Sequence, residues 1–483
     1  MKEKLWKYRG RKIRHSMRHA VARNVTLLSV FLLLGSFVAI AGVRKLDVSY
    51  LIGREPFRFL FLHPKLYFAQ GAAQQVYWYL LCAAVTTFVI LVMLYFLCHP
   101  LYKRMIHRQK LARMIASNSF MESKVEEKEL WTNGWKHKQE TISYYPKMYY
   151  RVHKGYVYIR IAMDMSKHQS RFLDLGKEFE HGLYCDLVEE VMEDGFVCYK
   201  LLYDVAINRI NIEDMKAKNG SIQLMKTAAW NYDTVPHALI AGGTGGGKTY
   251  FILALIEAFL KIGALIDIAD PKRADLADLE AVMPGRIRYA EGGIIPLIEK
   301  FKNDMISSWE VVKQRPDYVT GKNYAYYGLK PHILVFDEYA AFMEMLDFQA
   351  KAKVDSAMKQ ILMLGRQAGY LVILGVQRPD AEYIGGAMRD QFGLRVTLGK
   401  MYPVGYQMMY GEADKSFKHK NIKGRGYADL GYGSIQEFYS PFVSKDHDFL
   451  TSIGKLVEAQ GAPVAIATGG NRSEQADTNL EGA

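Results

Sequence analysis

The chain has 483 residues, of which 50% are hydrophobic and 23% charged, and it carries a net charge of +13. This length allows two or three domains with a sizeable core, and the low charged fraction favours membrane segments. Its four cysteines form no CxxC pair, so no standard zinc site is expected.

Two long uncharged runs follow a basic N-terminus, residues 1–24. Residues 25–43 and 76–97 contain no charged residue, and each run is long enough to cross a bilayer as a helix. A signal peptide is the alternative for the first run and a buried core helix for the second. The first run is too long for a signal peptide, and "GVRKLD" is a poor cleavage site. We therefore predict two transmembrane helices joined by an extracytoplasmic loop, residues 44–75.

The basic excess lies beside these two runs. Residues 1–23 carry +8, residues 99–113 carry +5 and the loop 44–75 carries +3, which leaves residues 114–483 with −3. Lys and Arg accumulate on the cytoplasmic side of membrane helices, and they are also attracted to anionic lipid. The net charge therefore predicts a cell-membrane protein with both termini cytoplasmic and gives almost no support for DNA binding.

Residues 98–141 are predicted to be a juxtamembrane helix and a charged linker. Residues 142–230 then read as a small α/β domain, in which "YYRVHKGYVYIRIAM" and "FVCYKLLYDV" have the composition of strands. Between them, "FLDLGKEFEHGLYCDLVEEVMEDG" has apolar residues at helical spacing. The predicted apolar face of this helix consists of Leu183, Leu187, Val188, Val191 and Met192.

Residues 231–450 alternate short apolar strands with helices. "HALIAG", "ALIDIAD", "HILVFDE" and "YLVILGVQ" are near-continuous apolar runs, as in parallel strands buried on both faces. This pattern predicts a doubly wound, mainly parallel α/β sheet. Residues 451–483 are predicted to be a partly disordered C-terminal tail, because the last part lacks apolar residues.

The stretch "AGGTGGGKTY" fits the phosphate-binding pattern G-x-x-x-x-G-K-[ST], and it stands between an apolar strand and a helical run. Glycines let several backbone N–H groups approach phosphate oxygens closely. Lys248 is expected to bind the β- and γ-phosphates of ATP, and Thr249 to supply a hydroxyl to Mg²⁺. The predicted nucleotide-binding residues are Gly242, Gly243, Thr244, Gly245, Gly246, Gly247, Lys248, Thr249 and Tyr250.

Two further strand ends carry candidate catalytic residues. Asp337 ends an apolar strand and is expected to hold the Mg²⁺ shell, while Glu338 would orient the attacking water. Gln377 ends another buried strand and could sense the γ-phosphate. The alternative is an ordinary acidic strand end for the first pair and a simple edge polar residue for Gln377.

Three segments resemble the FtsK/SpoIIIE family of DNA translocases: "VPHALIAGGTGGGKT", "DIADPKRADLADL" and "GRQAGYLVILGVQRPDAEYIGG…LRVTLG". The resemblance covers about residues 230–400. It implies a RecA-like P-loop fold, a hexameric ring around DNA and an arginine that completes the neighbouring subunit's site. Arg366 and Arg395 lie at family-like positions, and both stay candidates. Arg273 and Arg378 belong to family motifs without an assigned role.

The chromosome-segregating members of this family have four membrane helices, a long linker and a C-terminal winged-helix domain. This chain shows two predicted membrane helices, a short linker and about 30 residues after Leu450. Its layout is similar instead to the TcpA-like coupling proteins of Gram-positive conjugative elements. That resemblance implies partners: non-specifically bound DNA, a relaxase and the proteins of a type IV-like secretion channel.

Three other functions fit the sequence less well. A chromosome-partition translocase would need a guidance domain, and type VII protein-export ATPases usually carry several ATPase modules, whereas this chain has one P-loop. A non-enzymatic scaffold would not need the combination of Lys248, Thr249, Asp337 and Glu338. The sequence therefore favours an ATP-driven DNA translocase.

Overall fold

The computed structural model of the protein describes residues 8–43, 71–129, 136–203, 205–411, 415–418 and 420–461. The chain forms two compact units. The first comprises Met1–Val152, Tyr158–Tyr184 and Val191–Tyr199, and the second comprises His153–Val157, Cys185–Glu190 and Lys200–Ala483.

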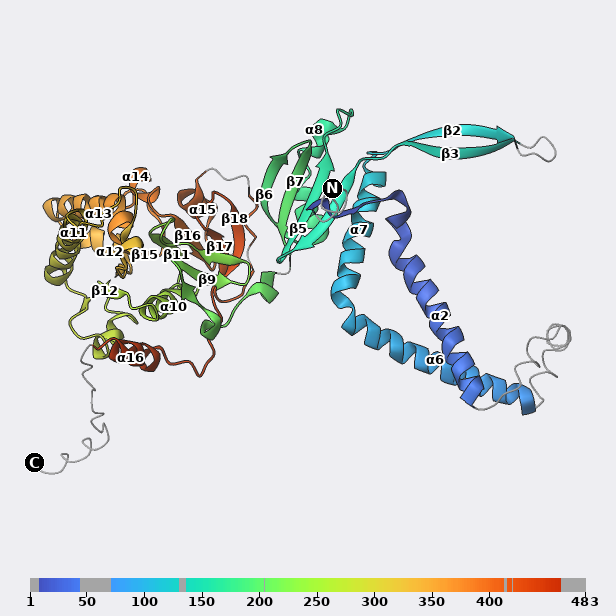
Figure 1. The fold of residues 1–483 in the computed structure, drawn as a ribbon, viewed down its shortest axis with the longest axis horizontal. Coiled ribbons are helices and arrows are strands. Elements are labelled where there is room, and N and C mark those ends of the chain that lie inside the picture. Colours follow the sequence, from blue (N-terminus) through green and yellow to red (C-terminus); the bar gives the residue numbers. More distant parts are fainter. Residues whose placement is uncertain are drawn as a thin grey trace, which may run out of the picture. The chain divides into compact units, whose positions relative to one another are not determined.

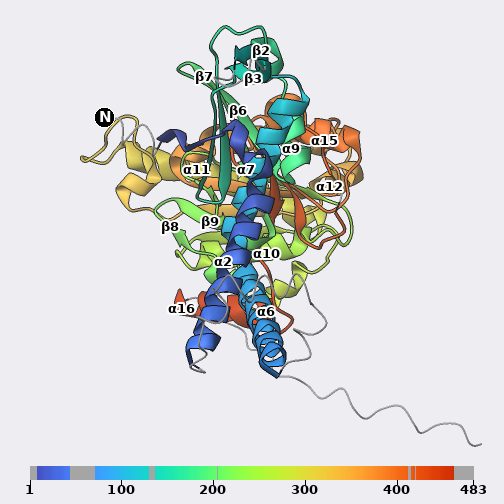
Figure 2. The same cartoon turned by 90° about the vertical axis from the view of Figure 1, so that its right-hand side faces the viewer.

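Two long apolar helices, α2 (Ala20–Val43) and α6 (Gly71–Leu97), lie side by side in the first unit (Figures 1 and 2). Ser36 joins them, because its Oγ lies 3.2 Å from the Ala83 carbonyl oxygen and 3.1 Å from Thr87 Oγ1. Both helices are long and apolar enough to cross a membrane. The loop predicted over residues 44–75 lies outside the described residues, apart from the first turn of α6.

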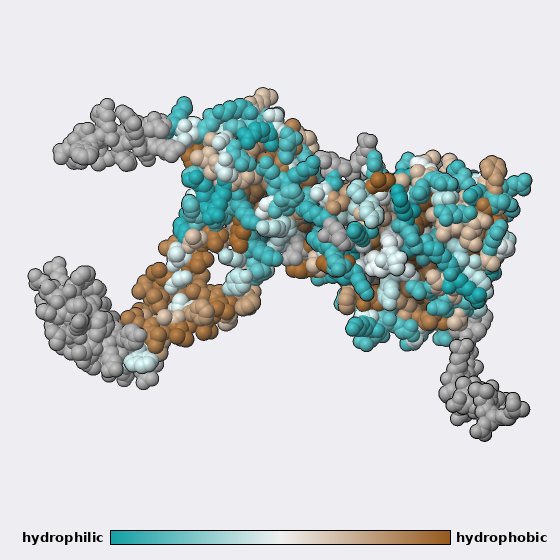
Figure 3. Space-filling view, turned by 180° about the vertical axis from the view of Figure 1, so that it is seen from behind, coloured by the Kyte–Doolittle hydropathy of each residue, from teal (hydrophilic) through white to brown (hydrophobic). Residues whose placement is uncertain are grey.

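Large apolar side chains of both helices face outward. Phe31 of α2 is 74% exposed and Phe88 of α6 is 67% exposed, and Figure 3 shows the apolar surface that these helices present. An uncovered apolar surface of this extent is unusual for a protein that meets only water.

Helix α7 (His99–Ser117) forms where the sequence predicted a helix after the second apolar run, and Pro100 stands in its first turn, where a missing N–H costs nothing. After it, the segment predicted as a linker contains two antiparallel strands, β2 (Glu122–Glu129) and β3 (Lys136–Tyr144). Its charged composition shows no apolar alternation, so the sequence carried no strand signal there.

The small α/β domain contains a five-stranded sheet with the order β1-β4-β5-β7-β6. Its strands are β1 (Arg11–Lys12), β4 (Met148–His153), β5 (Tyr156–Ala162), β6 (Asp186–Glu193) and β7 (Phe196–Leu202), and its helices are α8 (Gln169–Phe172) and α9 (Gly176–Leu183). The strands predicted around residues 148–162 and 196–202 are therefore present.

The helix predicted through Met192 is wrong in its second half. Helix α9 ends at Leu183, and Tyr184 adopts a left-handed backbone conformation with φ 55°. The remaining apolar residues of the predicted face, Leu187, Val188, Val191 and Met192, lie in strand β6. The signal for this strand was the Asp194-Gly195 pair between β6 and β7, with Gly195 at φ +73°, because Asp-Gly favours tight hairpin turns.

The second unit is built on an eight-stranded sheet with the order β13-β12-β14-β15-β11-β16-β17-β18. The first six strands run parallel, and β17 and β18 continue the sheet antiparallel. In chain order these strands are β11 (Ala238–Gly242), β12 (Leu265–Ala269), β13 (Ile287–Arg288), β14 (His332–Phe336), β15 (Tyr370–Val376), β16 (Leu394–Leu398), β17 (Arg425–Asp429) and β18 (Ile435–Tyr439). This arrangement confirms the predicted doubly wound, mainly parallel sheet.

Helices cover both faces of this sheet (Figure 1). Strand β11 shows the two cores directly, because Ala238 and Ile240 join one apolar cluster while Leu239 and Ala241 join the other. One face carries α10 (Lys248–Leu260) and α16 (Phe449–Ala459), and the other carries α11 (Glu291–Lys313), α12 (Tyr339–Met345) and α13 (Phe348–Ala368). Two shorter helices, α14 (Gly386–Arg389) and α15 (Pro403–Tyr410), flank β16 in the chain.

Residues 200–230, predicted to belong to the small domain, are grouped with the second unit. They include a three-stranded sheet of β8 (Ala217–Lys218), β9 (Ser221–Met225) and β10 (Ala228–Trp230). Trp230 is fully buried, and its ring lies 5.8 Å from that of Phe259 in α10. Burial of these side chains in the α10 core explains why this segment belongs to the larger unit.

Candidate functional site

The glycine-rich stretch forms a tight loop between β11 and α10, as the sequence predicted. Gly245 and Gly247 have φ of +79° and +98°, a region that favours glycine. A Cβ on Gly246 would lie 2.7 Å from the Leu398 carbonyl oxygen, so this position also has no room for a side chain. Lys248 is the first residue of α10, and the loop therefore delivers its lysine at a helix N-terminus.

Lys248 is held between the two acidic residues that follow β14. Its side chain is only 8% exposed, its Nζ lies 2.7 Å from Asp337 Oδ1, and it also donates to Glu338 Oε1. A second lysine contributes, since Lys272 Nζ lies 3.1 Å from Glu338 Oε2. The sequence predicted one nucleotide site for Lys248, Asp337 and Glu338, but it predicted neither these ion pairs nor the contact of Lys272 with Glu338.

The sheet order explains how these residues meet. Strand β15 lies between β11 and β14, so it separates the strand before the loop from the strand before Asp337. Gly375 of β15 leaves room for that carboxylate, because a Cβ there would lie 2.2 Å from Asp337 Oδ1. Gln377 follows β15 directly and is exposed, which puts it at the same carboxyl edge of the sheet. Ligands of open α/β sheets bind at this edge.

Glu338 has an unusual backbone for a non-glycine residue, with φ 54° and ψ 41°. Such left-handed residues cluster at functional sites. Burial by itself would raise the pKa of Glu338, but the hydrogen bond and charge of Lys248, followed by those of Lys272, lower it below the usual value. Glu338 is therefore an ionised carboxylate at neutral pH.

Asp270, the first residue of the Asp-Pro-Lys-Arg run, is a further candidate site residue, since the charge of Asp337 acts on it. It follows β12 and is fully buried, and its Oδ2 accepts hydrogen bonds from the backbone N–H of Ala274, at 2.8 Å, and of Ala277, at 3.2 Å. Its Oδ1 has no partner among the described residues. Burial, and after it the charge of Asp337, raise the pKa of Asp270. The signal available in the sequence was an acidic residue directly after a buried strand, as for Asp337.

The two candidate arginines differ in their surroundings. Arg366 is exposed near the end of α13, and the described residues offer it no hydrogen bond or ion pair. Arg395 donates to the carbonyl oxygens of Phe392, at 3.1 Å, and Arg389, at 3.2 Å, and its side chain is only 18% exposed. Arg366 is therefore exposed without a partner among the described residues, whereas Arg395 is held by carbonyl oxygens of its own chain.

A second contact that the sequence did not reveal joins the loop to the strand β17 region. The backbone N–H of Gly424 donates to the Gly246 carbonyl oxygen at 3.1 Å. Arg209 Nε donates to the Ser440 carbonyl oxygen at 2.8 Å, and its guanidinium lies near Gly424. The phosphate-binding loop is thus supported from outside the strand–loop–helix motif.

The residues present fit a magnesium nucleotide. Glycines 245–247 form a cradle without side chains, and Thr249 stands in the first turn of α10. Asp337 and the unpartnered Oδ1 of Asp270 are oxygen acceptors of the kind that Mg²⁺ binds. Among the described residues no group of three or more His, Cys, Asp or Glu side chains forms a metal cage. Mg²⁺ sites commonly use one or two carboxylates together with substrate phosphates.

No protein-family model matches the sequence. The FtsK domain-containing protein YdcQ of Bacillus subtilis (strain 168) is 46% identical over 479 residues, which are 98% of this chain and 97% of that protein. The DNA translocase FtsK of Staphylococcus epidermidis is 24% identical over 298 residues, and the match covers 57% of this chain but only 34% of that relative.

Among solved structures, the chain is similar to the monomer form of the pCW3 conjugation coupling protein TcpA with ATPγS. The TM-score is 0.47 at 20% identity, with 64% of this chain and 93% of that chain covered. The identity to YdcQ, by contrast, extends over nearly the whole of both chains. Together with the geometry of the phosphate-binding loop and its acidic partners, it shows that this protein belongs to the FtsK domain-containing family of P-loop ATPases.

Proposed function

We propose that the protein is a membrane-anchored, ATP-driven DNA translocase that acts as a conjugative coupling protein. It would deliver DNA, together with a relaxase, to a type IV-like secretion channel. The observation that carries the proposal is the assembled site of Lys248, Asp337 and Glu338 in a chain of FtsK type. Relatives named DNA translocase FtsK match about half of this chain.

The anchor would be the pair of helices α2 and α6. Both have outward-facing apolar side chains, and the basic residues 1–23 and 99–113 flank them. The Lys and Arg bias supports an orientation in which both flanks, and therefore both termini, would be cytoplasmic. This orientation gives the ATPase unit access to cytoplasmic ATP.

The geometry suggests how the chain's own residues would act. Bound ATP supplies the phosphoanhydride bond whose hydrolysis drives the motor, and Mg²⁺ neutralises phosphate charge. Lys248 would exchange its two carboxylate partners for phosphate oxygens. Asp337 would then be free for the metal shell, and Glu338, ionised at neutral pH, would orient and polarise the attacking water.

A hexameric ring would complete each site with an arginine from the neighbouring subunit. Arg366 suits this role better than Arg395, because it is exposed and unbonded among the described residues. Gln377, exposed at the sheet edge, would report the state of the γ-phosphate. DNA in the ring would be bound mainly through its phosphates, without reading of base sequence.

The test uses the full chain purified in detergent. We expect an ATPase rate that DNA of unrelated sequences raises to a similar extent, and DNA binding that weakens steeply between about 50 and 200 mM salt. Lys248→Ala should lose nucleotide affinity, because the phosphate charge is then unmatched. Glu338→Gln should still bind nucleotide but lose turnover, because only the water loses its partner.

The outcomes separate the alternative functions. A strong preference for one short DNA sequence would favour a chromosome-partition translocase. An ATPase that neither binds nor responds to DNA at any salt concentration, once assembled as a ring, would favour protein export. Near-normal hydrolysis by Glu338→Gln would remove that residue from the catalytic role.

A further inference from the structure

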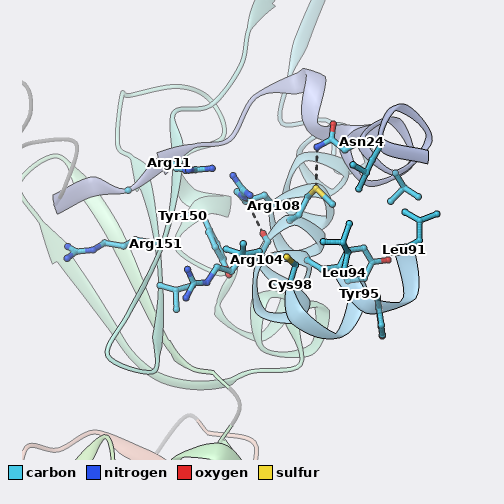
Figure 4. Close-up of a pocket in the computed structure, with 17 residues that line it drawn as sticks. Arg11, Asn24, Leu91, Leu94, Tyr95, Cys98, Arg104, Arg108, Tyr150 and Arg151 are labelled. Carbon is cyan, nitrogen blue, oxygen red and sulfur yellow. Dashed lines mark hydrogen bonds between the residues drawn. The ribbon is translucent and has the colours of Figure 1, made fainter. Parts of the chain in front are cut away.

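A cavity of about 900 Å³ lies within the first unit, at one end of the helix pair (Figure 4). Its walls come from the start of α2, the end of α6, the first half of α7 and strands β1 and β4. This volume is within the range of cavities that hold small molecules.

One side of the cavity is apolar. Leu28 of α2 and Leu91, Leu94 and Tyr95 of α6 line it, and Leu101 of α7 continues the wall. Leu28 and Leu101 remain substantially exposed, at 41% and 61%. An apolar wall built from the ends of two apolar helices suits an acyl chain rather than a polar metabolite.

The other side carries four arginines. Arg11, Arg104, Arg108 and Arg151 line the cavity toward β1 and β4, away from Leu91 and Leu94 (Figure 4). The printed sequence has no Asp or Glu in α7, β1 or β4. Within the described residues, none of these guanidiniums has a carboxylate partner. Arg108 Nε instead donates to the Arg104 carbonyl oxygen at 3.2 Å, and Arg151 donates to that of Tyr8 at 3.0 Å.

The positive charges of Arg11, Arg104 and Arg108 oppose one another. Burial, and after it the charge of Arg11, lower the pKa of Arg108, and the charge of Arg104 adds to this effect. A negative group placed between them would relieve the repulsion. Guanidinium groups bind phosphate with paired hydrogen bonds, and they are less strongly hydrated than lysine ammonium groups.

We propose that this cavity binds one anionic phospholipid, whose headgroup phosphate contacts the arginines and whose acyl chain lies along the apolar wall. The inference rests on the membrane hairpin proposed above. In that orientation the cavity lies at the cytoplasmic ends of α2 and α6, the depth at which lipid headgroups meet the hydrocarbon.

A general attraction of basic residues to anionic membranes would not need a site, because it depends on net charge and not on position. Helix α7 offers a matched control for this difference. Lys110 and Arg113 belong to the same helix but do not line the cavity. Lys110 donates to the Gly182 carbonyl oxygen and Arg113 to that of Arg18.

The test is native mass spectrometry of the full chain, stripped of lipid in detergent. Phosphatidylglycerol and phosphatidylcholine with identical acyl chains are added at equal concentration. We expect a single bound phosphatidylglycerol, preferred at least about tenfold over phosphatidylcholine. Both lipids carry the phosphate that the arginines would bind, but only phosphatidylcholine adds a quaternary ammonium, which these arginines repel. Inorganic phosphate alone should give no adduct.

Arg104→Gln/Arg108→Gln should lose this preference, whereas Lys110→Gln/Arg113→Gln, with the same loss of charge, should keep it. Arg108→Lys, which retains the charge but not the paired donors, should give an intermediate value. Equal binding of the two lipids by the unmodified chain would overturn the proposal, and so would an equal loss in both double variants. The comparison of the two lipids on the unmodified chain does not depend on whether any variant folds.

Failure of the lipid site can be told apart from failure of the anchor. If the chain leaves the membrane fraction in alkaline carbonate, the hairpin proposal itself is wrong. If the chain stays in the membrane but shows no lipid preference, only the site is refuted. Neither outcome involves the ATPase readout of the proposed function.

Discussion

The most direct test of the ion pairs at this site is to replace Lys248 with alanine and to measure the free energy of unfolding in the absence of nucleotide. Its ammonium is buried between Asp337 and Glu338, with each of the three side chains no more than 12% exposed. Breaking a buried ion pair by removing one partner costs about 3–5 kcal/mol, because the remaining charge stays buried. Lys272 still pairs with Glu338 in the Lys248→Ala variant, so we expect the lower end, about 3 kcal/mol.

A loss of this size should be visible as a shift in melting temperature. For domains of 150–250 residues, 1 kcal/mol corresponds to roughly 2–4 °C, which gives about 6–12 °C for Lys248→Ala. The control is Lys359→Ala. Lys359 pairs with Asp355 on the surface of α13, and the Lys359 side chain is 52% exposed. Exposed pairs contribute about 0–1 kcal/mol, so the control should melt close to the unmodified protein.

The pH dependence gives a second check on the same reasoning. The folded state lowers the pKa of Glu338, so this group stabilises the fold above its unfolded pKa of about 4.3. That contribution is lost as the pH falls through the lower folded pKa. The difference in melting temperature between the unmodified protein and Lys248→Ala should therefore become smaller as the pH falls from 7 toward acid values. If Lys248→Ala without nucleotide melts within about 2 °C of the unmodified protein at pH 7, the buried ion pairs do not contribute the stability inferred for them.

Three further predictions concern other parts of the chain. Gly246→Ala should reduce nucleotide affinity by about tenfold or more, measured by titration with a fluorescent ATP analogue, because its Cβ would lie 2.7 Å from a backbone oxygen. Arg366→Ala should abolish DNA-stimulated hydrolysis without changing nucleotide affinity, whereas Arg395→Ala should mainly lower the melting temperature. The reverse pattern would mean that Arg395, and not Arg366, acts at the neighbouring subunit's site. A cysteine at Ser49 should be labelled from outside the cell and one at Ser16 should not, and labelling in the opposite sense would place the ATPase on the wrong side of the membrane.

The residues of the candidate nucleotide site could largely be proposed from the sequence because they are marked by local pattern. Glycines at forced conformations, a lysine at a helix start and acidic residues at strand ends are visible without knowledge of the fold. Asp270 carried the same strand-end signal as Asp337, so its place in the site could also have been inferred. Lys272 could not, because its contact with Glu338 depends on how the chain turns after β12.

Strand β6 shows why the small domain was harder to predict. Leu187, Val188, Val191 and Met192 fit a helical spacing as well as they fit a short edge strand, and only the following Asp-Gly turn separates the two. The grouping of β8–β10 with the larger unit was not predictable either. Burial of Trp230 beside Phe259 is a tertiary contact, and no composition change in the sequence marks it.

The strand order has a consequence for how the site comes into being during folding. Lys248 and Asp337 are 89 residues apart in the chain, and β15, which separates their strands, is made later still. Closing such long loops makes these pairings slow to form, and no shorter fragment contains the finished pocket. ATP can therefore recognise only a chain whose synthesis has passed Val376. At a hundred times its dissociation constant, a ligand of this kind favours the native state by about 2.7 kcal/mol. Nucleotide would thus stabilise the assembled site as well as drive the motor.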